Sequence, residues 1–192
     1  FYQSSLIEGI SSNLEAYINR GNISPDINTN NIFVGPMAFI SNITGVHNVA
    51  IGPLSLQSNT FGDRNIGIGR ATLQDNTSGD DNIAIGASAL ADNILGNFNI
   101  AIGSSALQQS QNASYNIAIG DNVLENVADA ATQNIAIGHE AMNQNYSGQF
   151  NIALGNVALY NNTYGTHNIA IGANALENSA TPNNNIAVGS NV

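Results

Sequence analysis

Histidine and aspartate are the residues of this chain that could do chemistry, by binding a metal ion or by moving a proton. The three histidines are His47, His139 and His167, and His139 is followed by Glu140. No two of them have the spacing of metal ligands. The sequence also lacks a Ser-His-Asp arrangement and a glycine loop of the phosphate-binding type. We therefore expect a protein that is not an enzyme and has no cofactor and no resident metal.

Two pairs of aspartates have the same spacing along the chain, Asp63 with Asp80 and Asp75 with Asp92. If the fold stacks them, the carboxylates repel one another unless water screens them or a cation such as Ca²⁺ bridges them. No repeated Asp-Gly calcium-loop motif accompanies the pairs, and this favours screening by water.

Aromatic residues recur in the polar stretches and are the candidates for contact with a receptor. They are Phe98, Tyr115, Phe150 and Tyr164. Exposed rings among asparagine and aspartate can form a sugar-binding surface. The alternative is that the rings cover a groove between protomers.

The composition excludes some partners. The 192 residues contain no lysine and only three arginines, against 13 carboxylates, which gives a formal charge of −10. Nucleic acid is not an expected partner, because phosphate binding needs clustered basic residues. No run of 18 apolar residues occurs, so no membrane span is expected. Because the chain begins at Phe1 and stops within a repeat, we expect a processed chain or a fragment.

A 17-residue repeat organises the chain from Asn31 onward. Its unit is N-I-A-I-G-x-x-A-L-x-x-N-x-x-G-x-x, numbered here as positions 1 to 17, and the unit that begins at Asn116 is longer by a single residue. The opening asparagines are Asn31, Asn48, Asn65, Asn82, Asn99, Asn116, Asn134, Asn151, Asn168 and Asn185. A short fixed period is typical of a solenoid, whose units bury apolar residues against their neighbours.

The positions of the unit differ in chemistry. Positions 2 and 4, such as Ile83 and Ile85, are aliphatic, and their alternation predicts a short strand with both residues pointing inward. Position 9, usually leucine as at Leu90, supplies a facing apolar column. Glycine at position 5 suits a sharp exit from the strand, and the opening asparagines are expected to form an amide ladder. Positions 10 to 17 are expected to form an outer loop. The prediction is an all-β parallel β-roll.

Position 3 would then point outward, yet it is alanine in eight of ten copies. A small apolar residue held at an outward position suggests close packing against another protomer, so we expect a homotrimer. The alternative is that this alanine packs beneath the return loop of its own chain. The candidate interface residues are Ala50, Ala84, Ala101, Ala118, Ala136, Ala153, Ala170 and Ala187.

Residues 1–20 differ from the repeats. Ile7, Ile10, Leu14 and Tyr17 have the spacing of an amphipathic helix, which could form a coiled coil or cap the solenoid. Residues 21–30 are rich in turn formers and are expected to be a linker, and residues 31–192 the solenoid.

The phrase Asn-Ile-Ala-Ile-Gly followed by Ala-Leu, as in residues 82–90, resembles the head repeats of YadA-like trimeric autotransporter adhesins. Residues 151–165 resemble repeats of phage tail fibres that precede a chaperone domain of the endosialidase type. The resemblance covers residues 31–192, although the adhesin repeat is usually shorter than the unit of this chain. It implies a trimeric fibre for attachment, located outside the cell or on a virion.

We therefore expect a structural or adhesive segment of a phage tail fibre or a bacterial adhesin, with itself and a host glycan or receptor as partners. The first alternative is a structural filament whose subunits join end to end. The second is an ice-binding or surface-binding solenoid, which is disfavoured because no flat outward array of threonine recurs.

Overall fold

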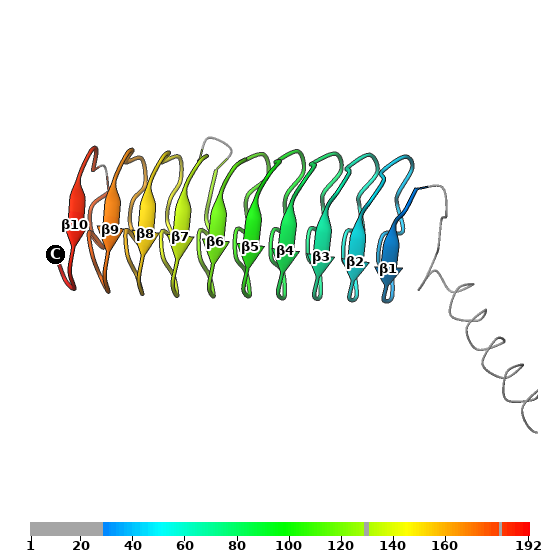
Figure 1. The fold of residues 1–192 in the computed structure, drawn as a ribbon, viewed down its shortest axis with the longest axis horizontal. Helices are drawn as coiled ribbons and strands as arrows, with labels where there is room; N and C mark the ends of the chain where they lie inside the picture. Colours follow the sequence, from blue (N-terminus) through cyan, green and yellow to red (C-terminus); the bar gives the residue numbers. More distant parts are fainter. Residues whose placement is uncertain (1–28, 129–130, 181) are drawn as a thin grey trace, which may run out of the picture.

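The computed structural model describes residues 29–128, 131–180 and 182–192, and these residues form one row of short strands (Figure 1). Each strand has three residues and occupies positions 2 to 4 of one repeat. In order they are β1 (Ile32–Val34), β2 (Val49–Ile51), β3 (Ile66–Ile68), β4 (Ile83–Ile85), β5 (Ile100–Ile102), β6 (Ile117–Ile119), β7 (Ile135–Ile137), β8 (Ile152–Leu154), β9 (Ile169–Ile171) and β10 (Ile186–Val188).

All ten strands form a single parallel sheet in sequence order. Each strand pairs with the next in a register that places equal repeat positions side by side, as in Ala84 beside Ala101. The register survives the longer coil, where Ala118 lies beside Ala136. The prediction of an all-β parallel solenoid built from 17-residue coils is therefore confirmed.

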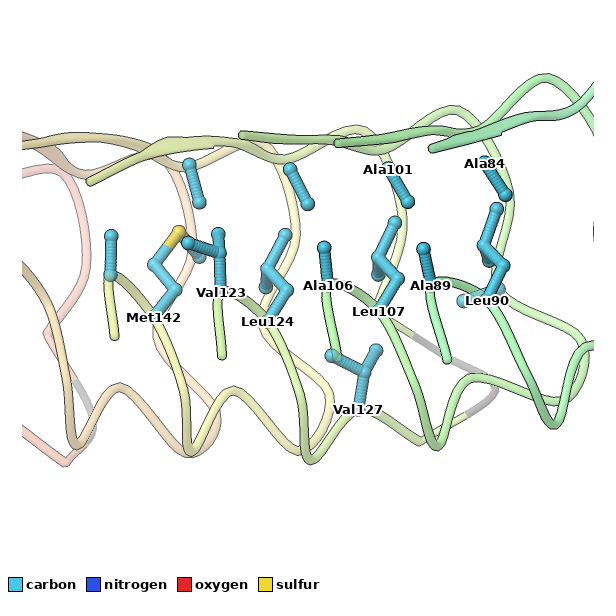
Figure 2. Packing of buried hydrophobic residues seen from close by; sticks show 14 of the residues in the cluster. Ala84, Ala89, Leu90, Ala101, Ala106, Leu107, Val123, Leu124, Val127 and Met142 are labelled. Carbon is cyan, nitrogen blue, oxygen red and sulfur yellow. The ribbon is translucent and has the colours of Figure 1, made fainter. Parts of the chain in front are cut away.

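The faces of the strands are the reverse of the prediction. Ala84 and Ala101 at position 3 are fully buried, whereas Ile102 at position 4 remains 36% exposed. Figure 2 shows Ala84 and Ala101 pointing from the sheet toward Leu90 and Leu107 on the facing wall. The coil is thin, so an alanine methyl group opposite a leucine fills it. Isoleucine at positions 2 and 4 lies on the outer face.

The prediction that the position-3 alanines contact another protomer is consequently wrong, because these side chains pack inside their own coil. Ala187, in the last coil, is half-buried. The other seven have no exposed surface: Ala50, Ala84, Ala101, Ala118, Ala136, Ala153 and Ala170. Period-two alternation shows that position 3 faces away from positions 2 and 4, but it does not show which face is internal.

The facing apolar column at position 9 is confirmed. It is buried from the first coil to the eighth, with Phe39 and Met142 in place of leucine in two coils. The wall that carries it is not extended, since Leu90 and Leu107 have φ of 50° and 52°, in the left-handed region. Gly103 at position 5 has a φ of 136°, and a Cβ there would overlap the carbonyl oxygen of Gly120. Both the positive φ of the turn and the close stacking of neighbouring coils therefore require glycine at position 5.

The helix expected over residues 1–20, and residues 21–28 of the expected linker, lie outside the described residues. Residues 29–30 form a turn that precedes β1. The described residues contain no helix, and all ten strands lie within the solenoid expected over residues 31–192.

Candidate functional site

The opening asparagines from Asn31 to Asn168 form a buried ladder inside the solenoid, and Asn185 in the last coil is exposed. Asn99 is fully buried, and its Nδ2 donates to the Ala113 carbonyl at 2.8 Å and to Asn82 Oδ1 at 3.1 Å. Its Oδ1 accepts from the backbone N–H of Asn116 at 3.0 Å. The ladder satisfies the polar atoms of the coil edge, so these asparagines are structural and are not available to a ligand.

A second asparagine ladder at position 12 was missed by sequence reasoning, which assigned positions 10 to 17 to an outer loop. Asn76 is fully buried, and its Nδ2 donates to Asn59 Oδ1 at 2.7 Å and to the Gly79 carbonyl at 3.0 Å. Asn93 donates in turn to Asn76 Oδ1 at 2.7 Å. The signal in the sequence was the recurrence of asparagine at position 12 with glycine at position 15.

The outer face of the sheet carries two columns of aliphatic side chains, at positions 2 and 4, and we call it the isoleucine face. Its most exposed members are Ile32 58%, Val34 38%, Ile51 38%, Ile68 37%, Ile102 36%, Ile137 39%, Ile171 38%, Ile186 75% and Val188 68%. The strands that carry these columns lie side by side along the whole row in Figure 1. Parallel sheets are normally covered on both faces, and a continuous exposed apolar surface marks an interaction site. This face is the main candidate surface for a partner.

The aromatic residues predicted to contact a receptor belong to three separate ring contacts. Phe98 and Tyr115, both at position 17, stack with ring centroids 5.1 Å apart and an interplanar angle of 12°. Phe150 shares their column but stacks instead on His167, at 4.9 Å and 16°. Tyr164 lies at position 14 and contacts Tyr146 edge-on at 6.1 Å.

The first pair of stacked aspartates is held by hydrogen bonds and an arginine. Asp80 Oδ1 accepts from the backbone N–H of Asp63 at 2.7 Å. Beside them the Arg64 guanidinium makes two hydrogen bonds to Asp81, at 2.6 and 2.8 Å. Those bonds hold the pKa of Asp81 below its ordinary value. Arg64 therefore supplies a positive charge that offsets the carboxylate repulsion in this group.

Among the residues that the structure describes, no arginine forms an ion pair with Asp75 or Asp92, the second pair. Partial burial, and then the charge of Asp75, raise the pKa of Asp92 above its ordinary value. Within residues 29–128, 131–180 and 182–192, no three side chains of the His, Asp and Glu types are grouped so that they could hold a metal ion. His139 lies about 4.0 Å from both Asp121 and Glu140, and all three are on the surface.

In the part of the chain that the structure describes, no helix has the length and hydrophobicity needed to cross a membrane. Comparisons with protein-family models, with curated proteins and with solved structures found no match to this chain.

Proposed function

We propose that this chain is a non-enzymatic rod segment of an extracellular attachment fibre and that its protomers associate as a homotrimer through the isoleucine face. The single observation that carries the proposal is this uncovered apolar face on a parallel sheet. The resemblance to repeats of trimeric adhesins and phage tail fibres supports the number of protomers and the location outside the cell or on a virion.

The rod shape suits such a role. Ten strands stacked at a spacing of about 4.8 Å span about 45 Å, and each coil contacts only its neighbours. The ladder of opening asparagines and the apolar column at position 9 run through successive coils, and the ladder at position 12 is interrupted at Ser110 and Val127. The solenoid is therefore stiff along its length, as the shaft or head of a fibre must be.

The energy available on the isoleucine face can be estimated from exposure. Burial of a whole isoleucine side chain contributes about 1.5–3 kcal/mol. Five isoleucines at position 4 retain exposures of 36–39%: Ile51, Ile68, Ile102, Ile137 and Ile171. Covering that fraction contributes about 0.6–1.1 kcal/mol for each, or about 3–5 kcal/mol for each protomer. Because association itself costs about 4–15 kcal/mol, the interface must run along the whole rod to be stable.

Sedimentation velocity of the 192-residue chain at micromolar concentration tests the proposal. We expect a species of three chains. The double variant Ile102→Glu with Ile137→Glu should sediment as a monomer, because it places charges inside the interface. The matched control is Ile40→Glu with Ile43→Glu, which changes residues that are 64% and 66% exposed but lie outside the strands. This control should remain a trimer.

Circular dichroism of each variant establishes that the solenoid is folded. A wild-type chain that is monomeric at micromolar concentration would refute association, and a stable dimer would refute the trimer. If the control variant dissociates and the variant with changes at Ile102 and Ile137 remains a trimer, the interface lies on another surface.

A further inference from the structure

The surface loops contain a hollow at the one irregular coil of the solenoid. The longer coil begins at Asn116, whose Nδ2 donates to the Ala131 carbonyl at 2.9 Å, 15 residues ahead. In the neighbouring coils the same bond spans 14 residues. Beside Val127 and Ala128 of the longer coil, a hollow of about 630 Å³ opens between the loops that follow β5, β6 and β7.

The cause of the hollow is a small residue in a column of larger ones. At position 13, Gln111 and Tyr146 line the two sides of the hollow, and Ala128 lies between them in the stack. Stacked coils are about 4.8 Å apart, so the missing side chain leaves a slot about two coil spacings wide. The volume lies within the range of about 300–1,000 Å³ that is typical of small-molecule sites.

One wall of the slot is an aromatic ring. Tyr146 is 57% exposed, and Tyr164 contacts its ring edge-on, with centroids 6.1 Å apart and an interplanar angle of 70°. The Tyr146 carbonyl accepts a 2.8 Å hydrogen bond from the N–H of Ala128, which fixes the backbone beneath the ring. The ring is therefore held in place while much of its surface remains open.

The other walls carry primary amides. Gln109 and Gln111 are exposed, and within the described residues their side chains make no hydrogen bonds. Asn126 donates to Asn143 Oδ1 at 2.9 Å, which leaves its own carbonyl oxygen able to accept. Each amide offers both donors and an acceptor, so it can donate a hydrogen bond to a sugar hydroxyl group and also accept one from it.

The charged residues near the hollow limit the class of ligand that it can bind. Asp92 and Gln109 both occupy position 11, one coil apart. Glu125 directly precedes Asn126, and the Glu125 carboxylate accepts a hydrogen bond from Asn143 Nδ2 at 3.0 Å. Arg64 and Arg70, the arginines of the described residues, lie in the coil that begins at Asn65 or just before it. Within the described part of the chain, an anionic sugar would meet carboxylates and no positive charge, so the hollow suits a neutral sugar.

We propose that the hollow bounded by Tyr146, Gln109, Gln111 and Asn126 binds a neutral pyranose, stacked on the Tyr146 ring and hydrogen-bonded to the amides. An aromatic ring packs against the C–H groups of a sugar face, and the amides form hydrogen bonds with the hydroxyl groups of the sugar. This inference rests on the proposed attachment function, for which it supplies the class of receptor. It places the contact away from the isoleucine face, so the site stays open when protomers associate there.

Saturation-transfer NMR on the full 192-residue chain tests the site, with the methyl glycosides of glucose, galactose, mannose and N-acetylglucosamine as probes and methyl glucuronide as the anionic comparison. We expect transfer to the ring protons of at least one neutral probe and much weaker transfer to the glucuronide. Tyr146→Ala should weaken binding of that probe at least tenfold. Ala128→Gln, which fills the slot and keeps the tyrosine, should do the same.

The matched control is Phe61→Ala, because Phe61 is an aromatic residue that is 55% exposed and lies outside the hollow. This variant should bind the probe as strongly as the wild type does. The site is refuted if no neutral probe shows transfer, if the glucuronide binds as well as the neutral probes, or if Phe61→Ala weakens binding as much as Tyr146→Ala. Sedimentation of the same samples separates the two proposals. A trimer without sugar binding overturns only the site, whereas a monomer that binds sugar overturns only the trimer.

Discussion

Removal of one amide from the buried ladder, by Asn99→Ala, should destabilise the solenoid more than any change to its polar surface. The substitution removes the acceptor of the Asn116 N–H and the donor to the Ala113 carbonyl. These two backbone groups have no other described partner. Asn82 Oδ1, by contrast, keeps its 3.0 Å bond from the Asn99 N–H, and the Asn116 side chain keeps its bond to Ala131.

The magnitude follows from these two orphaned groups. A buried donor or acceptor left without a partner costs about 1–3 kcal/mol, so the expected loss in the free energy of unfolding is about 2–6 kcal/mol. The matched control is Asn161→Ala. The Asn161 amide also bonds to the asparagine one coil away, to Asn178 Oδ1 at 3.0 Å, but this bond is exposed. Water replaces it there, and the change should stay within about 0.5 kcal/mol.

Urea denaturation followed by circular dichroism measures the loss, and hydrogen exchange locates it. The backbone amide of Asn116 should lose protection in Asn99→Ala, and amides several coils away should lose less, because each coil contacts only its neighbours. A loss below about 1 kcal/mol, or equal losses for Asn99→Ala and Asn161→Ala, would show that water reaches the ladder and would refute the reasoning.

Two further predictions test the faces of the sheet and its charges. Ala101→Leu should lower the free energy of unfolding by about 3 kcal/mol through overpacking, and Ile102→Val should lower it by at most about 1 kcal/mol. Urea denaturation measures both losses. A larger loss for Ile102→Val than for Ala101→Leu would place Ala101 on the outer face. Because folding raises the pKa of Asp92, its carboxylate lowers stability once ionised. Asp92→Asn should therefore match the wild type below the ordinary aspartate pKa of 3.8 and gain stability relative to it as the pH rises above that value. A relative loss in thermal melts at rising pH would contradict this.

The fold class and the repeat boundaries could be predicted because the 17-residue period is directly visible in the sequence. Each coil presents the same residues to its neighbours, so Asn82 and Asn99 stack as a consequence of their spacing alone, and Leu90 joins a buried column. The loops were less predictable. Position 12 was assigned to the surface, although Asn76 is buried there, because asparagine in a turn-rich segment has the same local signature whether it faces water or closes an internal ladder.

The candidate sites were predicted only in part. Phe98 and Tyr115 share one column, as their equal repeat positions indicate, but Tyr164 belongs to a different group with Tyr146. The hollow around Ala128 could not be predicted, because it depends on how the three loops that follow β5, β6 and β7 meet around a small side chain.

By itself, the sequence determined the period, the parallel register and the alternation of the strand, since these follow from local spacing. Only the tertiary structure decided which side of the strand is internal. Isoleucine and alanine are both apolar, and alternation separates them without orienting them. The methyl group of Ala101 lies opposite Leu107 with no exposed surface, and a larger side chain there would overpack the coil. That choice turns the isoleucines outward, and it makes isoleucine rather than alanine the residue through which a partner is expected.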